Sequence, residues 1–261
     1  MNALKKDTEL VVGFNIPAEI GMAEKDISTP ALIIDLDAFE KNVKVMGEFV
    51  KKNGIRLRAH AKTHKSADIA LYQIEHGGAC GICCQKVSEA EALVTGGVSD
   101  VLVSNQIVGS RQIDRLARMA KQTRVIVCVD DLENVDDLST AAVKYGVQIE
   151  CLVEIDCGAG RCGVDWGEPV VEIARKIDAA QGLTFSGLQG YQGAAQHIHD
   201  FDQRRAKIDV AIKQLADTVK MLEAEGLECL IVGGAGTGTY YFEGASGVYN
   251  EIQCGSYIFM D

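Results

Sequence analysis

Short apolar runs alternate with amphipathic stretches along most of this chain. The apolar runs predict strands over residues 56–60, 79–85, 100–105, 124–130, 148–156, 183–191, 227–233 and 251–260. Between them, apolar residues recur at helical spacing, which predicts helices over residues 66–75, 88–94, 111–122, 133–145, 169–180 and 202–225. Unbroken alternation of strand and helix is typical of a parallel sheet, and near-continuously apolar strands are typical of a sheet covered on both faces.

The eight strands that begin at Arg56 make the set that an α/β fold of the (β/α)8 TIM barrel type requires. An open Rossmann sheet is the competing fold. A Rossmann sheet usually carries its glycine-rich fingerprint after its first strand, whereas the glycine-rich loops of this chain come late. The pattern therefore favours the barrel.

A ninth strand is predicted ahead of the barrel, over residues 31–35, and a helix over residues 37–52 follows it and ends at Asn53-Gly54. This strand needs another sheet to join, because the barrel set is already complete. The predicted organisation has three parts: an irregular segment over 1–28, a connecting strand and helix over 29–53, and a barrel over 54–261.

Composition narrows the possible partners and the compartment. A net charge of −11 argues against nucleic acid and against anionic membranes as partners. No apolar run approaches the roughly 20 residues that a membrane span requires. The first nine residues are polar and lack a signal-peptide core. We therefore predict a cytoplasmic protein that acts on a small molecule.

The nine cysteines show no disulfide spacing, so they indicate buried thiols in a reducing compartment. Cys80-x-x-Cys83 could be a redox pair or half of a zinc site. No second pair follows at zinc spacing, and two side chains three positions apart on a strand point to opposite faces. The pattern favours two structural thiols.

A basic stretch over residues 56–66 ends the first barrel strand. It places Lys62 in a predicted cluster formed by Arg58, His60, His64 and Lys65. Cationic surroundings disfavour the ammonium form of a lysine, and a neutral amine is what a Schiff-base nucleophile must be. For this stretch alone, a solvated basic strand end is the alternative interpretation.

Two glycine-rich loops follow the last two strands, where phosphate usually binds in (β/α)8 barrels. They are Gly233-Gly-Ala-Gly-Thr-Gly-Thr239 and Cys254-Gly-Ser-Tyr257. Glycines let the backbone approach an anion, and Thr237 and Ser256 add hydroxyl donors. Each loop by itself could be a tight turn. Together with Lys62 on the same rim, they predict pyridoxal 5′-phosphate (PLP), which requires both a lysine and a phosphate site.

At this point the chain resembles the fold-type III PLP enzymes of the alanine racemase type, and more narrowly the D-threonine aldolase/D-serine dehydratase family. The matching strings are residues 58–65, 153–163, 190–193, 234–240 and 253–257. The longer strings over 83–91, 191–198 and 240–244 look most like the β-hydroxyaspartate aldolases. The resemblance covers about residues 29–261 and implies the barrel of the alanine racemase N-terminal domain.

The resemblance implies a role for each matching residue. Lys62 is expected to be the Schiff-base lysine and the acid or base at Cα. Arg161 is expected to face the phenolic oxygen of the cofactor with Gln85 beside it, and Tyr191 to meet the pyridine nitrogen. The remaining residues expected to bind the cofactor are His60, Gly236, Thr237, Gly238, Cys254, Gly255, Ser256 and Tyr257.

The other catalytic residue implied by the resemblance is His197, as the base for the β-hydroxyl of the substrate. The alternative for His197 is a surface histidine at the start of a helix, and for Arg161 a structural loop arginine. His60 is expected to pack against the cofactor or to orient Lys62. Glu154 and Asp156 are alternatively charge partners for the basic cluster at the rim.

Known members of the family continue into a β-rich second domain, which holds a divalent metal through a histidine and a cysteine or aspartate. This sequence stops where the last barrel strand ends. We therefore expect a truncated chain that binds PLP but cleaves poorly, and whose ligands for Mg, Mn or Zn lie beyond residue 261. No metal ligand is assigned here, and a homodimer is expected if the full-length chain is present.

The implied function is that of a PLP-dependent lyase. It would cleave a β-hydroxy amino acid, 3-hydroxyaspartate in the leading interpretation, to glycine and glyoxylate by a retro-aldol reaction. The alternative with the same fold is a PLP- and metal-dependent dehydratase of D-serine or 3-hydroxyaspartate. A PLP carrier without turnover is the third reading, but it would need neither the ninth strand nor the string from Tyr191 to His197.

Overall fold

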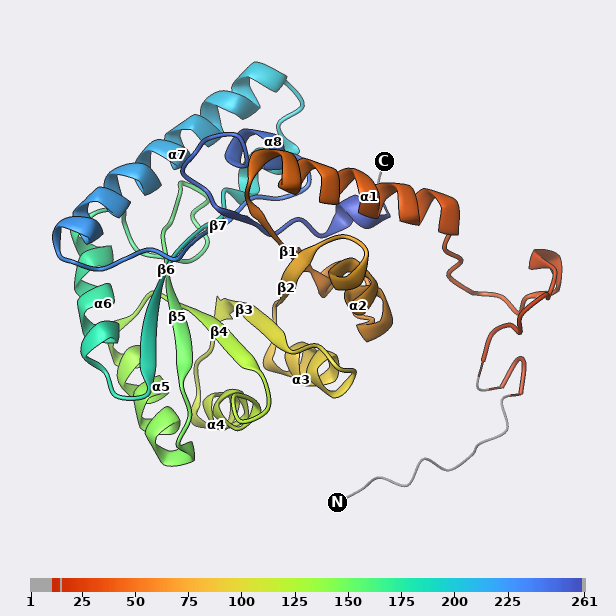
Figure 1. Cartoon of the computed structure of the whole chain (residues 1–261), viewed down its shortest axis with the longest axis horizontal. Helices are drawn as coiled ribbons and strands as arrows, with labels where there is room; N and C mark the ends of the chain where they lie inside the picture. Colours follow the sequence, from red (N-terminus) through yellow and green to blue (C-terminus); the bar gives the residue numbers. More distant parts are fainter. Residues whose placement is uncertain (1–10, 15, 260–261) are drawn as a thin grey trace.

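The centre of the molecule is a closed barrel of eight parallel strands, in which each strand pairs with the next and β8 returns to β1 (Figure 1). The computed structural model describes residues 11–14 and 16–259. The strands are β1 Arg56–His60, β2 Ala79–Cys84, β3 Asp100–Gln106, β4 Arg124–Val129, β5 Ile149–Glu154, β6 Leu183–Gly190, β7 Ile231–Gly234 and β8 Glu251–Ile252. The predicted barrel is confirmed, and the open Rossmann sheet is excluded.

Helices surround the barrel, and the seven longer ones follow the predicted order (Figure 1). They are α1 Leu36–Asn53, α2 Ala67–Glu75, α3 Val87–Thr95, α4 Ser110–Met119, α5 Leu132–Tyr145, α6 Glu168–Ala179 and α7 Phe201–Ala224. The sequence did not predict a short helix α8 Tyr240–Glu243 or the 3-10 turns η1 Glu24–Asp26, η2 Ala61–Thr63, η3 Gly193–His197 and η4 Ser256–Ile258. None of the helices in the described part of the chain is long and apolar enough to cross a membrane.

Alternation along the strands sorts side chains into two cores. On β2, Ile82 and Cys84 face the surrounding helices, whereas Cys83 between them faces the barrel interior. The buried interior layer consists of Cys83, Leu102, Ile126, Cys128, Leu152 and Ile231. Apolar side chains thus fill the side of the sheet that faces the helices and, on β2, β3, β4, β5 and β7, the barrel interior, so the sheet is packed from inside and from outside.

Two strand predictions fail at their ends. The strand predicted over residues 227–233 begins only at Ile231, because the N–H of Leu227 still bonds the Leu222 carbonyl at the end of α7. The strand predicted over residues 251–260 ends at Ile252. The chain beyond β8 turns into η4 instead, and residues 260–261 lie outside the described residues.

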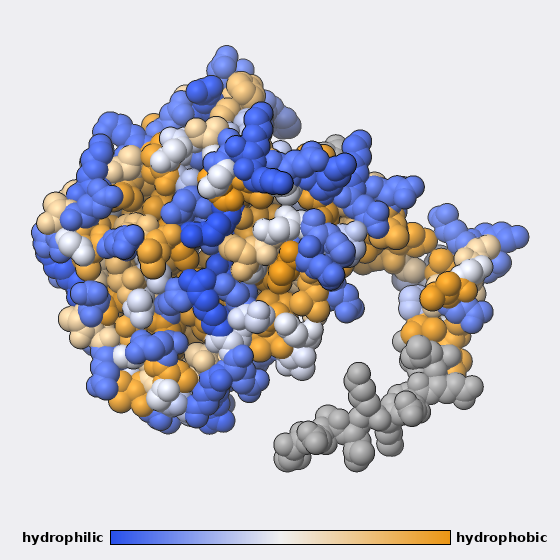
Figure 2. Space-filling view, viewed as in Figure 1, coloured by the Kyte–Doolittle hydropathy of each residue, from blue (hydrophilic) through white to orange (hydrophobic). Residues whose placement is uncertain are grey.

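The ninth strand, predicted over residues 31–35, is not formed. These residues are extended, but no strand of the described chain pairs with them, and a lone strand leaves its ladder hydrogen bonds unmade. Leu32, Ile33 and Ile34 are exposed. They belong to the segment before α1, which leads away from the barrel and carries apolar surface (Figures 1 and 2). The predicted irregular segment over 1–28 is described only from residue 11, without residue 15; its first ten residues lie outside the described part.

The cysteines are free thiols, and six of them are buried. The CxxC motif does not form a pair. The thiol of Cys80 bonds the Glu251 carboxylate near the base of the barrel, whereas Cys83 lies against Gln253 in the interior.

A network of charged side chains closes the end of the barrel opposite the strand C-termini. The Arg58 guanidinium is almost fully buried and bonds Glu251 of β8 at 2.8 Å and also Asp100 of β3. The network continues from Asp100 to Arg124 at 2.9 Å and from Arg124 to Glu150 at 2.6 Å. Burial opposes the charge of Arg58, but Glu251 and Asp100 together raise its pKa above the ordinary arginine value.

This network yields a prediction about stability. Replacing Glu251 by glutamine leaves the buried Arg58 charge with only Asp100, and removing one partner of a buried pair costs about 3–5 kcal/mol of unfolding free energy. Urea denaturation followed by circular dichroism measures the loss. The control is Glu225→Gln, which removes an exposed partner of Arg175 and should leave the denaturation midpoint almost unchanged. Equal losses in both variants would contradict the prediction.

Candidate functional site

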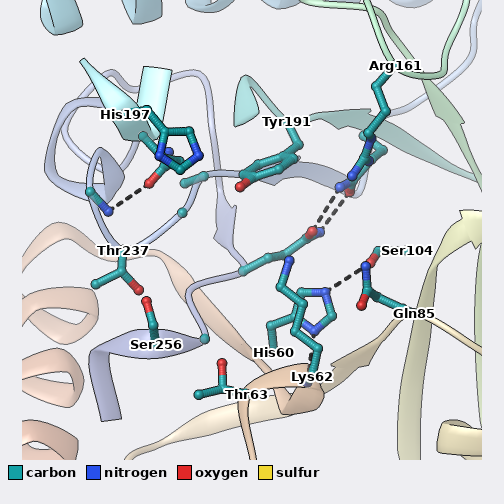
Figure 3. A pocket seen from close by; sticks show the side chains of 17 residues that line it. His60, Lys62, Thr63, Gln85, Ser104, Arg161, Tyr191, His197, Thr237 and Ser256 are labelled. Atoms are coloured by element: carbon teal, nitrogen blue, oxygen red, sulfur yellow. Dashed lines mark hydrogen bonds between the residues drawn. The ribbon is translucent and has the colours of Figure 1, made fainter. Parts of the chain in front are cut away.

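A cavity of about 550 Å³ opens at the C-terminal ends of the barrel strands (Figure 3). Every predicted site residue except Cys254 and Tyr257 lines it, namely His60, Lys62, Gln85, Arg161, Tyr191, His197, Gly236, Thr237, Gly238, Gly255 and Ser256. In Figure 3, Thr237 and Ser256 lie at one side of the cavity and Arg161 and Gln85 at the other, with Lys62, His60 and Tyr191 between them. The barrel thus gathers residues from six different strand ends.

The two exceptions support the cavity from behind. Cys254 is fully buried, and its carbonyl accepts from the N–H of His60 at 3.0 Å. The hydroxyl of Tyr257 accepts from the Gln73 amide at 2.8 Å, while its backbone N–H donates to the Thr237 hydroxyl at 3.0 Å. Tyr257 therefore holds the Thr237 loop in place with its backbone, while its hydroxyl bonds Gln73 of α2.

The cavity also has lining residues that the sequence analysis did not select, namely Thr63, Ser104, Gln189, Gln196, Ala235 and Gln253. Gln189 and Gln253 are buried and exchange two amide hydrogen bonds of 2.8 and 2.7 Å. They give the cavity a polar but uncharged floor. Gln189 lies near the end of a predicted apolar strand, and a polar side chain there is the signal that could have found it; Gln253 lies near the start of the strand predicted over residues 251–260, so its place at the rim follows only from the early end of β8 at Ile252.

The predicted cationic cluster around Lys62 does not form. Arg58 lies at the opposite end of the barrel, and Lys65 pairs with Glu89 at 3.5 Å. His64 contacts Gln73 at 3.2 Å, and burial lowers the pKa of its ring. The residue that shares its surroundings with Lys62 is Arg161, since both cations lie over the Tyr191 ring, at 5.8 and 5.6 Å from its centroid.

Arg161 is held by the buried carboxylate of Glu154, at 3.2 Å. The second oxygen of Glu154 accepts from the Gln106 amide at 2.7 Å. Burial opposes the charge on Arg161, but Cys162 and Glu154 raise the pKa of its guanidinium. Glu154 is thus a charge partner at the rim, but of Arg161 and not of the basic lysine cluster for which it was expected.

Asp156 shapes the loop that carries Arg161. One of its carboxylate oxygens accepts from the backbone N–H groups of Gly158, Ala159 and Gly160, at 2.9 to 3.0 Å. It forms no ion pair with the basic residues of the 56–66 stretch among the described residues. Its role as a rim charge partner is therefore not supported, and it instead folds the turn that presents Arg161 to the cavity.

His60 is buried under the cavity at the end of β1. Its Nδ1 accepts from the backbone N–H of Lys62 at 3.4 Å, and its Nε2 lies 3.4 Å from the Ser104 hydroxyl. Burial, followed by the charges of Lys62 and Arg161, lowers the pKa of His60 to about 3. A neutral ring that contacts the Lys62 backbone is well placed to fix where the lysine leaves the strand.

Tyr191 and His197 follow β6. Burial raises the pKa of Tyr191, so its hydroxyl stays protonated and able to donate. His197 ends η3, is exposed, and lines the cavity. It is not the start of a helix, since α7 begins at Phe201 with its own Asp200 cap. His197 is therefore exposed, as its alternative interpretation as a surface histidine expects, and it also lines the cavity, as a catalytic residue must.

The two glycine-rich loops meet at one side of the cavity. Within the described residues, the backbone N–H groups of Gly236, Thr237, Gly255 and Ser256 donate to no protein acceptor. A Cβ added at Gly255 would lie 2.9 Å from both the His60 carbonyl and the Thr63 hydroxyl, so only glycine allows this approach. Unpartnered N–H groups that converge on a cavity are typical of an anion site.

Comparison with known proteins identifies the family to which the chain belongs. The family described as the alanine racemase N-terminal domain matches residues 34–261. The chain belongs to this family. A 3-hydroxy-D-aspartate aldolase from Paracoccus denitrificans (strain Pd 1222) is 55% identical over the whole chain and 68% of its own length. The predicted resemblance to fold-type III PLP enzymes is thereby confirmed.

Two further relatives agree with this placement. The crystal structure of a D-threonine aldolase from Filomicrobium marinum superposes with a TM-score of 0.92 and 49% identity, over 94% of this chain and 66% of that one. A D-threo-3-hydroxyaspartate dehydratase from Delftia sp. (strain HT23) is 26% identical over 90% of this chain and 62% of its own length. This chain thus spans about two thirds of the length of the relatives it matches.

The protonation of His60 can be tested directly. Because burial and two nearby cations lower its pKa to about 3, we expect its ring to stay neutral from about pH 8 down to about pH 5, where an ordinary histidine becomes charged. Nitrogen NMR of histidine-labelled protein follows each ring, and His60→Asn identifies the signal. A signal that is lost in this variant and that titrates between about pH 6 and 7 would show that the ring is not shielded.

Proposed function

We propose that this protein is a PLP-dependent carbon–carbon lyase that cleaves a β-hydroxy amino acid by a retro-aldol reaction. The observation that carries the proposal is the placement of the Lys62 amine and the unpartnered N–H groups of the two glycine-rich loops around one cavity. The aldolase relatives support the reaction class. Because the chain spans about two thirds of their length, the activity of the whole protein is inferred rather than established.

The residues of the cavity fit PLP. Its phosphate would accept from the N–H groups of Gly236, Thr237, Gly255 and Ser256. Arg161, at the other side, would hold the phenolic oxygen ionised, with Gln85 beside it, and Lys62 lies between the two sides (Figure 3). When bound, the cofactor supplies an electron sink for the carbanion that Cα–Cβ cleavage produces.

The remaining residues orient and move protons. Burial keeps the Tyr191 hydroxyl neutral, and it would meet the ring nitrogen of the cofactor. A neutral partner would leave that nitrogen without a full positive charge, and the electron sink would be weaker than with a carboxylate partner. Lys62 would return a proton to Cα after cleavage. His197, which is exposed and lines the cavity, would take the proton from the substrate β-hydroxyl, which starts the retro-aldol step.

The proposed substrate is 3-hydroxyaspartate, which would give glycine and glyoxylate. Its second carboxylate needs a cation, and the lysine and arginine side chains that line the cavity are Lys62 and Arg161. Of the five basic groups expected at the rim, Lys62 and His60 line the cavity, and Arg161 joins them there. Elimination of the β-hydroxyl by a dehydratase is the alternative, supported by the more distant Delftia relative; a carrier without turnover is less favoured because His197 lines the cavity.

The metal and the oligomeric state also belong to this proposal. A divalent ion is expected from the family, but the described residues hold no group of three or more histidine, cysteine, aspartate or glutamate side chains that could bind one. A homodimer and a cytoplasmic location rest on the resemblance and on composition alone.

The first prediction of this proposal concerns Lys62. Purified protein incubated with PLP should show visible absorbance that borohydride abolishes, and mass spectrometry should find the reduced cofactor on Lys62. With manganese or magnesium added, 3-hydroxyaspartate should yield glyoxylate and glycine. The Lys62→Ala variant should lose both the adduct and the turnover. Oxaloacetate with ammonia would identify a dehydratase, an adduct without any product would identify a carrier, and no adduct would contradict the proposal.

The second prediction separates catalysis from cofactor binding. His197→Asn should lower kcat for glyoxylate release by about 10²–10⁴-fold, the usual contribution of a general base. The fraction of protein that carries PLP should stay unchanged, since the proposed phosphate contacts come from backbone N–H groups of the two glycine-rich loops and not from the His197 side chain. The neighbouring exposed His199→Asn is the matched control and should keep full activity. Equal activities in the two variants would remove His197 from the mechanism.

A further inference from the structure

Gln196 connects the loop after β6 to the glycine-rich loop after β7. Its side-chain oxygen accepts from the backbone N–H of Gly238 at 2.8 Å, and its side-chain nitrogen donates to the Thr239 hydroxyl at 2.8 Å. Gln196 lines the cavity beside the exposed His197 (Figure 3). One carboxamide thus fixes two successive positions of the proposed phosphate loop with both of its polar atoms.

The glycines of this loop are shaped around that carboxamide. A Cβ added at Gly236 would lie 2.6 Å from the Gln196 side-chain oxygen, and one added at Gly238 would lie 2.9 Å from the same atom. Both distances are too short for any real side chain. A side chain at either position would displace the Gln196 carboxamide, so these two glycines leave room for it, in addition to any approach of an anion.

A buried relay lies behind Gln196. The Thr239 hydroxyl, which accepts from Gln196, donates to the Glu243 carboxyl at 2.9 Å. Thr239 and Glu243 are almost completely buried, and the second oxygen of Glu243 has no hydrogen-bond partner. Because the Thr239 hydroxyl donates to Glu243, it accepts from the side-chain nitrogen of Gln196. The side-chain oxygen of Gln196 then faces the backbone N–H of Gly238 in the glycine-rich loop.

The groups that face Glu243 are all neutral. They are Cys157 after β5, Tyr191 after β6, Tyr249 before β8 and Cys254 after β8, and burial raises the pKa of each of them. No cation of the described residues contributes to its electrostatics. Burial accordingly raises the pKa of Glu243 to about 8, so the carboxyl is neutral below that pH and gains a buried, uncompensated charge above it.

We propose that Gln196 is a positioning residue, oriented by Thr239 and Glu243, which sets the geometry of the phosphate loop and keeps that loop in register with His197. The identity of the anion as the phosphate of PLP rests on the proposed function. The relay itself rests on contacts within this chain and concerns any phosphate at this loop.

The test uses two probes of the same loop, inorganic phosphate and PLP, with pyridoxal as a third probe that lacks the phosphate. Gln196→Ala and Thr239→Val should each weaken phosphate and PLP binding about tenfold, the usual effect of losing a hydrogen bond to a buried group. Pyridoxal binding should not change. Phosphorus NMR titration measures inorganic phosphate, and absorbance titration measures the two aldehydes.

Two variants serve as matched controls. Thr239→Ser restores the hydroxyl and should restore the affinity for phosphate. Gln203→Ala changes an exposed glutamine of α7 outside the relay and should bind all three probes as the wild type does. Circular dichroism verifies that each variant folds. In the wild type, the affinity for inorganic phosphate should decline as the pH rises above the pKa of Glu243, about 8.

Glu243→Gln tests the pH dependence of phosphate affinity, which would not change if Glu243 served only to stabilise the fold. It keeps an acceptor for Thr239 but cannot ionise, so its phosphate affinity should match the wild type at neutral pH and should lack the alkaline decline. Wild-type phosphate affinity in Gln196→Ala and Thr239→Val would overturn the proposal, as would an equal loss of pyridoxal binding. If the relay variants behave as expected with inorganic phosphate but PLP forms no adduct with Lys62, the proposed function fails and the positioning role stands.

Discussion

Closure of the barrel between β1 and β8 is the constraint on which the rest of this structure depends. Only two residue pairs join these strands, Arg56 with Glu251 and Leu57 with Ile252. The buried pair of Arg58 with Glu251 reinforces this short seam from inside. Because β1 carries Lys62 and β8 leads into the loop with Gly255 and Ser256, the same seam brings the candidate lysine beside the candidate phosphate loop.

The two ends of the barrel satisfy their polar groups in opposite ways. At the closed end, Arg58, Asp100, Arg124 and Glu150 pair with each other, so their charges are compensated within the chain. At the open end, the N–H groups of the two glycine-rich loops lack partners. Compensated charges stabilise a fold, whereas uncompensated donors around a cavity are available to a ligand. This asymmetry, rather than any single residue, marks the functional end.

Much of the fold could be predicted because strand and helix periodicities are local properties of the sequence. The strand count from Arg56 onward, the seven longer helices and the placement of Lys62 on the rim all follow from such patterns. Strand ends were less predictable. Residues 31–35 have the composition of a strand, but a strand forms only with a partner, and the extent of β8 depends on where its neighbours stop bonding it.

The sequence by itself determined the barrel, the family and most of the predicted residues that meet at its open rim, because each is carried by a contiguous string; it missed lining residues such as Gln189, Gln196 and Gln253. Only the tertiary structure decided which of those residues act on each other. It turned Arg58 away from Lys62, paired Arg161 with Glu154, and placed Gln196 on Gly238. Arg58 and Glu251 come from β1 and β8, and Gln196 and Gly238 follow β6 and β7, whereas Arg161 folds back onto Glu154 at the end of its own strand. A strand sequence states which face a side chain takes but not which neighbour it meets across the barrel or after a loop.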